Sequence, residues 1–319
     1  MATRRALPIR IMACGLGLAA LPLTATASER LVIPFEINRL EHMVVELEIN
    51  GSTPTTGVVD TAATFAMVDS NVAIRSGVIP PGDDPRMVNI LGVNGQRDYP
   101  VVHLDSVKAG NVSLIALAAA YNDDINVPGM VGNVLPASAF PGDVLEFDFE
   151  AGTITAYDGR PDVSKRRYSD KLAYDVEGGL IFVEVQINGR KGRALIDTGA
   201  SLSYVNSTFA KRASMRRNDE LTRLILGATG DKEKAWVVSV RRVRLADFFV
   251  ERPHLLVSDP VLLEKLGLAD EPIMVLGLDF LSRFRLQFDR RNQKLILSVP
   301  GDQVGGVDLN LSAEATRLR

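Results

Sequence analysis

The sequence contains a single cysteine, Cys14, among 319 residues. A disulfide within the chain is therefore excluded, and so is a metal site built from several cysteines. The sequence also lacks the His-Glu-x-x-His pair of zinc peptidases, the Gly-x-Ser-x-Gly elbow of serine hydrolases and a Gly-Lys-Ser/Thr phosphate loop. Its three histidines, His42, His103 and His254, are widely spaced, and we interpret each as a surface or packing residue. No metal and no cofactor is expected.

Neither sign of charge is in large excess, since 36 Lys and Arg residues face 39 Asp and Glu residues, a formal net charge of −3. No long basic block is present, so a nucleic-acid partner is not expected. The acidic pairs at 83–84 and 123–124 lack the alternating ligand spacing of a calcium loop, and we interpret them as loop charges.

The first 27 residues have the profile of a cleavable signal peptide. Three arginines, Arg4, Arg5 and Arg10, precede an apolar stretch at 11–23, and Ala-Thr-Ala at 25–27 provides a small-x-small cleavage site. We expect a periplasmic or secreted protein. Its mature chain would contain no cysteine, because Cys14 lies within the signal peptide. The apolar stretch is shorter than the roughly 20 residues that span a bilayer, so a stable membrane anchor is the less favoured alternative. The arginine pair leaves general secretory or twin-arginine export open.

Two similar stretches each place an aspartate directly after a short apolar run. At 193–205 the run ends at Asp197, followed by Thr198, Gly199, Ala200 and Ser201. An apolar run this short, followed by glycine, is typical of a buried strand that ends in a turn. The same arrangement occurs at 57–68, where the aspartate is Asp60.

The similarity extends to a repeated series of segments in the same order. The pairs are 43–51 with 181–189, 58–73 with 195–210, 89–96 with 224–231, 130–135 with 275–280, and 146–155 with 287–296. Five collinear matches at nearly constant displacement indicate duplication of one unit. Short alternating or apolar segments separated by Gly, Asn, Asp and Pro predict an all-β fold. Short helices are expected at 70–75, at 207–212 after Asn206, and at 259–266, with Asp259 as cap and Pro260 in the first turn.

Asp-Thr-Gly-Ala-Ser after an apolar strand resembles the active-site motif of the aspartic proteases, particularly bacterial retropepsin-like members, over about residues 40–297. The resemblance implies two homologous retropepsin-like β-barrel lobes with a cleft between them. We assign the lobes to 28–158 and 179–300, an interlobe linker to 159–178 and a flexible tail to 301–319. A monomer is plausible because one chain supplies both aspartates.

The resemblance also implies roles for individual residues. Asp60 and Asp197 would be catalytic. The residues expected to support them are Thr61, Ala62, Thr64, Thr198, Gly199 and Ser201. Two flap hairpins would bind substrate through tips that contain Gly92, Asn94, Gly95, Gly227, Thr229 and Gly230. The apolar-Gly segments expected behind the two turns are Val131 with Gly132 and Leu276 with Gly277.

The implied reaction is hydrolysis of a peptide or protein substrate by water activated between the two aspartates, which share one proton as carboxyl pairs of this kind do. Ala63 and Ala200 follow the glycine position, as in retroviral enzymes, so the expected pH optimum is less acid than that of a gastric enzyme. One departure is Ala62, which replaces the family's glycine. The alternative is therefore a catalytically degenerate module that uses the same cleft to bind peptides or proteins.

Overall fold

The computed structural model describes residues 29–92, 95–123, 131–163, 167–226 and 232–300. The predicted signal peptide at 1–27 and the tail at 301–319 lie outside these ranges. Within them the elements are mostly strands, so the predicted all-β fold is confirmed. The first half contains β1 (Leu31–Ile37), β2 (Met43–Ile49), β3 (Thr55–Asp60), β4 (Ala66–Asp69), α1 (Ser70–Arg75), β5 (Met87–Gly92), β6 (Gly95–Ala109), β7 (Val112–Asn122), β8 (Val134–Pro136), η1 (Ala137–Ala139), β9 (Val144–Asp148) and β10 (Thr153–Tyr157).

The second half follows the same general order. It contains β11 (Arg167–Glu177), β12 (Leu180–Ile187), β13 (Arg190–Ile196), β14 (Tyr204–Val205), α2 (Ser207–Arg212), β15 (Arg216–Leu226), β16 (Lys232–Ser239), β17 (Arg242–Leu245), β18 (Phe248–Glu251), β19 (His254–Val257), α3 (Val261–Lys265), β20 (Ile273–Leu276), α4 (Leu278–Leu281), β21 (Arg285–Asp289) and β22 (Lys294–Pro300).

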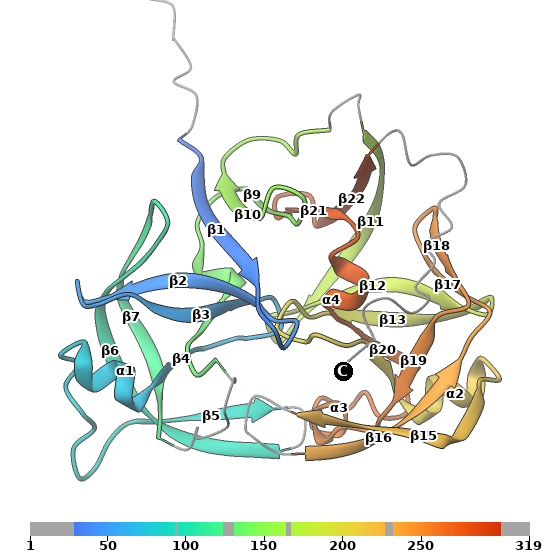
Figure 1. The fold of residues 1–319 in the computed structure, drawn as a ribbon, viewed down its shortest axis with the longest axis horizontal. Coiled ribbons are helices and arrows are strands. Elements are labelled where there is room, and N and C mark those ends of the chain that lie inside the picture. The colour runs from blue at the N-terminus through green and yellow to red at the C-terminus, as the bar shows by residue number, and fades with distance from the viewer. Residues whose placement is uncertain (1–28, 93–94, 124–130, 164–166, 227–231, 301–319) are drawn as a thin grey trace, which may run out of the picture.

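A six-stranded antiparallel sheet joins the two halves, in the order β1-β10-β9-β21-β22-β11 (Figure 1). The central pair, β9 with β21, takes one strand from each half. β11 lies within the predicted linker at 159–178, pairing with β22 along 167–173 and with β12 along 174–177. Much of that range is therefore part of the sheet. The charged side chains of β11 are tolerated in a strand because most of its described side chains are not buried.

The remaining pairings are alike in the two halves. In the first, β2 and β3 are antiparallel, β3 runs parallel to β8, and β4 lies between β8 and β7. In the second, β12 and β13 are antiparallel, β13 runs parallel to β20, and β14 lies between β20 and β19. Each half therefore places the carboxyl end of one central strand beside a parallel neighbour. That end is where each candidate aspartate lies.

The turns that precede these central strands follow from their Asn-Gly sequences. Asn50 and Gly51 have φ angles of 51° and 67°, and Asn188 and Gly189 have φ angles of 51° and 78°. Two successive positive φ angles suit the right-handed twist of a hairpin, and Asn-Gly adopts them at low cost. These two turns set the register of the strands that lead to Asp60 and Asp197.

The helix predictions are confirmed at 70–75 and 207–212. Asn206 caps α2 by accepting the Phe209 N–H at 2.9 Å. The third prediction is partly wrong. α3 covers only 261–265, and its cap is Pro260 without a side-chain hydrogen bond. The Asp259 carboxylate instead accepts the Ser207 N–H at 2.8 Å, so a contact with α2 replaces the expected local cap.

The apolar core continues from one half into the other through the β9–β21 pair. Phe147 and Phe288 pack edge to face there, with ring centroids 5.9 Å apart. Beside them, Arg285 and Glu146 form an ion pair of 2.7 Å in which both side chains are less than a tenth exposed. Asp148 and Asp162 also lie within 3.6 Å and 3.5 Å of the Arg285 guanidinium, so the halves are joined by apolar packing and by a group of ion pairs centred on Arg285.

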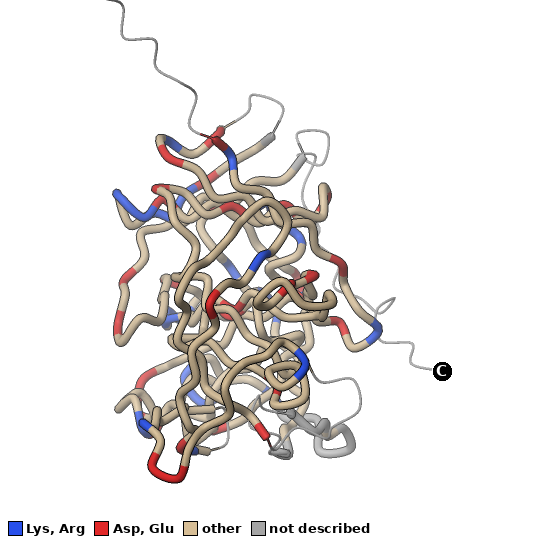
Figure 2. The backbone as a smooth tube through the Cα atoms, turned by 90° about the vertical axis from the view of Figure 1, so that its left-hand side faces the viewer, with Lys and Arg blue, Asp and Glu red and all other residues tan. Residues whose placement is uncertain are grey.

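Charges of both signs are interspersed along the backbone (Figure 2). In the part of the chain that the structure describes, no helix has the length and apolarity needed to cross a membrane. The same residues contain no cluster of three or more His, Cys, Asp or Glu side chains arranged to hold a metal ion.

Candidate active site

The two predicted catalytic aspartates lie at equivalent places in the two halves. Asp60 is the last residue of β3, and Asp197 directly follows β13. The residue before each aspartate is paired in parallel register, Val59 with Leu135 and Ile196 with Leu276. Each carboxylate is therefore held at the end of a buried strand whose neighbour runs in the same direction.

Reciprocal hydrogen bonds between Thr61 and Thr198 hold the two turns together. The Thr61 hydroxyl donates to the Ile196 carbonyl at 2.7 Å and accepts the Thr198 N–H at 3.0 Å. The Thr198 hydroxyl donates to the Val59 carbonyl at 2.8 Å and accepts the Thr61 N–H at 3.1 Å. All four bonds cross between the halves, and both threonines are buried. They fix the positions of the adjacent aspartates relative to each other.

The two carboxyl groups lie within hydrogen-bonding reach of each other. The Asp60 carboxylate accepts the Ala62 N–H at 2.7 Å. The Asp197 carboxylate accepts the N–H groups of Gly199 and Ala200, each at 2.9 Å. Both side chains also line the contact between the halves without being fully enclosed, since each residue is only partly buried by area.

Electrostatics favour one shared proton. Burial, followed by the negative charge of Asp60, raises the pKa of Asp197 to about 8. Burial also raises the pKa of Asp60, although the N–H groups of Ala62, Ala63 and Gly199 act in the opposite direction. Both carboxyl groups therefore disfavour full ionisation of the pair, which favours a single proton shared between them. Strictly, the two groups titrate as a unit.

The structure explains why alanine replaces glycine in only one turn. A Cβ atom at Gly199 would lie 2.5 Å from Oδ2 of Asp60, so the Asp60 carboxylate would have to shift from its place beside Asp197. Ala62 has no positive φ angle, so its methyl group causes no left-handed strain. That methyl packs instead against an apolar cluster of the second half that includes Phe182 and Leu195.

The supporting segment behind Asp197 is confirmed at Leu276 and Gly277, where a Cβ on Gly277 would approach the Ala200 carbonyl oxygen to 2.8 Å. The corresponding assignment of Val131 and Gly132 is wrong. The strand beside β3 is β8, and its register places Leu135 and Pro136 behind Asp60. The apolar-Gly pattern pointed to the wrong residues because proline, not glycine, takes the equivalent place in this half.

The other predicted site residues are brought together only in part. The Ser201 carbonyl accepts the Asp279 N–H at 3.2 Å. Thr64 is exposed and lies beside Gly179 of the second half. A Cβ atom added to Gly179 would be 3.1 Å from the Thr64 methyl group. Gly92 and Gly95 pair at the end of the β5–β6 hairpin. The remaining flap residues, Asn94, Gly227, Thr229 and Gly230, lie outside the described residues.

The two flap hairpins, β5–β6 and β15–β16, extend toward each other along the same side of the molecule (Figure 1). α3 of the second half contacts both β5 and β6. This helix therefore touches the flap of the opposite half.

Three residues near the dyad were missed from the sequence. His42, interpreted as a surface or packing residue, approaches the backbone of Gly199, while burial lowers its pKa. Ser203 and Asp279 bond to each other behind the turn of Asp197. A usable signal for Asp279 was present, because Gly-Leu-Asp directly follows the apolar strand β20.

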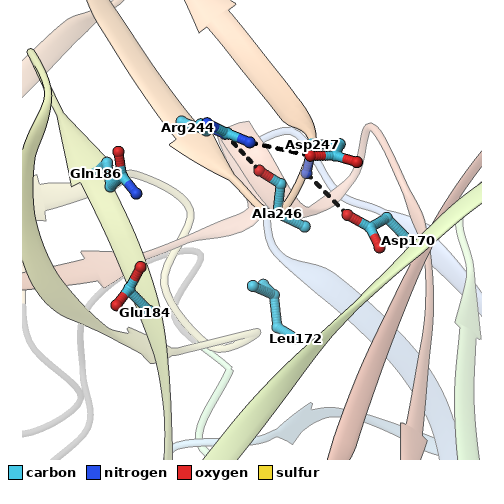
Figure 3. A pocket seen from close by; sticks show the side chains of 7 residues that line it. All are labelled: Asp170, Leu172, Glu184, Gln186, Arg244, Ala246 and Asp247. Carbon is cyan, nitrogen blue, oxygen red and sulfur yellow. Dashed lines mark hydrogen bonds and ion pairs between the residues drawn. The ribbon is translucent and has the colours of Figure 1, made fainter.

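A pocket of about 230 Å³ lies elsewhere, between β11, β12 and the β17–β18 turn (Figure 3). Arg244 donates to the Ala246 carbonyl at 2.7 Å and to the Asp247 carboxylate at 3.0 Å. Asp170 accepts the Asp247 N–H at 3.0 Å. These polar groups bind one another, and neither candidate catalytic aspartate lines the pocket.

Comparison with known proteins gives an independent finding. A family model described as aspartyl protease matches residues 45–135 and residues 183–280. Protein DDI1 homolog 2 of Mus musculus is 27% identical over 141 residues, which cover 44% of this chain and 33% of that protein. The similarity therefore spans about a third of that relative's length.

Proposed function

Because this chain belongs to the aspartyl protease family, we propose that it is an aspartic endopeptidase whose catalytic pair is Asp60 and Asp197. The observation that carries the proposal is the set of four reciprocal threonine hydrogen bonds, which join the turn of Asp60 directly to the turn of Asp197. A pair of surface carboxylates would have no need of such a buried connection.

In the proposed reaction, ionised Asp60 removes a proton from a water molecule, which attacks the carbonyl carbon of the peptide bond. Asp197 gives its proton to the carbonyl oxygen, so no charged oxyanion forms in the partly buried site. The proton taken up by Asp60 then passes to the departing amide nitrogen as the C–N bond breaks. A hydroxyl of the tetrahedral intermediate returns its proton to Asp197 as the carbonyl group re-forms. General acid-base transfer of this kind contributes about 10²- to 10⁴-fold to rate.

We propose an extended peptide or protein segment as substrate. The flap hairpins would add backbone hydrogen bonds to it, in the way that an added strand does. The raised pKa of Asp197 supports activity at less acid pH than a gastric enzyme requires, because the pair keeps its proton until the pH approaches about 8.

The wider setting is also a proposal. The matched strand pairings of the two halves support duplication of a single retropepsin-like unit. We propose that this unit is of the bacterial type that the sequence motif resembles. One chain supplies both aspartates, so the active form would be a monomer. The pattern of residues 4–27 supports export to the periplasm or beyond, without a stable membrane anchor.

The test incubates the full chain with a diverse peptide mixture at several pH values and identifies new termini by mass spectrometry. Asp60→Asn and Asp197→Asn variants run beside the wild type. We expect each single substitution to abolish cleavage, because one carboxyl group alone cannot act as both base and acid.

Two other results would overturn the proposal. Cleavage that continues in either variant would remove the pair from the mechanism. Peptides that bind to the wild type but stay uncut at every pH would favour the alternative of a peptide-binding module. Ala62, the feature that suggested this alternative, causes no backbone strain.

A further inference from the structure

A buried polar bridge lies directly behind the second catalytic turn. The Ser203 hydroxyl donates to Oδ1 of Asp279 at 2.5 Å and accepts the Gly277 N–H at 2.8 Å. Ser203 is 2% exposed. The bridge thus connects the end of the catalytic turn to the start of α4, which is 76 residues away in the chain.

The same segment also binds the backbone of the turn. The Leu278 N–H donates to the Ala200 carbonyl at 2.8 Å, and the Asp279 N–H donates to the Ser201 carbonyl at 3.2 Å. The Ala200 N–H in turn donates to the Asp197 carboxylate. Backbone hydrogen bonds of residues 278 and 279 therefore hold Ala200 and Ser201, and Ala200 in turn binds the Asp197 carboxylate.

The first half has none of the side chains that this bridge requires. By strand register and spacing, Ala66 takes the place of Ser203, Pro136 that of Gly277 and Ser138 that of Asp279. Alanine has no hydroxyl, and proline has no N–H to donate. Ser138 is exposed. The donor and both partners are replaced together, so the bridge belongs to the turn of Asp197 alone.

We propose that Asp279 is a positioning residue for the reaction proposed above, acting through Ser203 to hold the turn that presents Asp197. The inference rests on the proposed function for its activity readout. The group required is an oxygen that accepts the Ser203 hydroxyl proton, and asparagine at position 279 would supply one.

The partly buried carboxylate of Asp279 is otherwise hard to explain. Burial raises the pKa of Asp279 to about 6, despite hydrogen bonds from Ser203 and from the Phe280 N–H. A group that is disfavoured in its charged form near neutral pH does not improve the stability of the fold. Its place behind the turn of Asp197 is accounted for if it positions that turn.

The experiment measures kcat and KM on a peptide that the wild type cleaves, for Ser203→Ala, Asp279→Ala, Asp279→Asn and the matched control Ser138→Ala. We expect Ser203→Ala and Asp279→Ala to lower kcat about 10- to 100-fold with little change in KM, as small displacements of a catalytic group do. Asp279→Asn should stay within about 3-fold of wild type, since it keeps the accepting oxygen. Ser138→Ala should behave as wild type.

A general loss of folding is separated from loss of position by recording the urea transition of each variant. Ser203→Ala is the decisive variant, because alanine occupies the matching position in the folded first half. Unchanged kcat in folded Ser203→Ala would overturn the inference. An Asp279→Asn variant as impaired as Asp279→Ala would also overturn it, since the bridge would then need the charge and not the oxygen.

A second readout keeps the inference separate from the proposed function. If the wild type cleaves no peptide, the proposed function fails. Carboxyl ¹³C NMR of the aspartates then still reports on the bridge. We expect Ser203→Ala to move the titration midpoint of Asp197 by about half a pH unit or more, because its backbone donors shift with the turn. A midpoint as unchanged as that of Ser138→Ala would overturn the inference.

Discussion

The turn of Asp60 and the turn of Asp197 have the same threonine contacts but different surroundings. The first has Ala62 beside its aspartate and Pro136 behind it, and the second has Gly199 and Gly277. A Cβ atom at Gly199 would lie 2.5 Å from the Asp60 carboxylate, whereas the Ala62 methyl group packs against apolar side chains of the second half. Two turns of one motif therefore need not satisfy the same steric requirement, because each faces a different neighbour.

The largest expected effect comes from exchanging the residues that differ next to the aspartates. Gly199→Ala should lower kcat/KM more than about 100-fold, because its Cβ would displace the Asp60 carboxylate. Ala62→Gly should stay within about 3-fold and cost about 0.5–1 kcal/mol of stability through added backbone freedom. Initial rates on one cleaved peptide and urea unfolding measure both. Similar losses from the two substitutions would show that the turns are sterically equivalent after all.

The connection between the halves can be broken at the buried ion pair. Glu146→Leu should destabilise the protein by about 1.5–3 kcal/mol, because Arg285 loses its closest buried partner but keeps Asp148 at 3.6 Å and Asp162 at 3.5 Å. Urea unfolding checks this. The matched control is Glu184→Leu, which removes the exposed pair with Lys191 and should cost at most about 1 kcal/mol. Equal losses would mean that burial of the Arg285 pair has no special effect.

The polar bridge of the second half predicts a pH dependence that the first half lacks. The folded-state pKa of Asp279 is about 6 against an ordinary value of 3.8, so the folded state binds this proton more tightly. The stabilising contribution is full below about pH 4 and is lost as the pH rises to 6. The pKa difference corresponds to about 3 kcal/mol. Arg283 faces the group and opposes the shift.

Asp279→Asn removes this titration. Its stability relative to wild type should therefore increase by about 3 kcal/mol between pH 3.5 and pH 7, as measured by urea unfolding across that range. Ser138→Ala, in the first half, should show a constant difference from wild type. A constant difference for Asp279→Asn as well would show that Asp279 has an ordinary pKa.

The smallest effects concern the caps of the two equivalent helices. Asp69 accepts two N–H groups at the start of α1, from Asn71 at 3.0 Å and Val72 at 3.1 Å. Asp69→Ala should cost about 1 kcal/mol. Asn206 also bonds to Ile273 and to two carbonyls between 269 and 271, so Asn206→Ala should cost about 2–3 kcal/mol. Thermal unfolding of the two variants gives the comparison, and equal losses would contradict it.

Local signals predicted the features that depend on near neighbours in the chain. Helices α1 and α2 begin and end where expected, because their caps are side chains within three residues. The Asn-Gly turns follow from the positive φ angles that these residues tolerate. The apolar runs before Asp60 and Asp197 are buried strands because they are too short and too apolar for other elements.

Features that depend on distant partners were missed or misplaced. Val131 and Gly132 were chosen by pattern, but strand pairing selects Leu135 and Pro136. The charged segment that contains β11 became a strand because β22 and β12 provide partners for its backbone.

The sequence by itself determined the all-β class, the two aspartate turns and their threonines. These features depend on short motifs that occur twice in the chain, and each motif predicts its own local structure. Only the tertiary structure decided that Ser203 meets Asp279 and that Gly199, but not Ala62, must be free of a side chain. The physical reason is that a hydrogen bond or a steric limit between residues far apart exists only once strand register has brought their atoms together. The register itself depends on burial of both halves around β9 and β21.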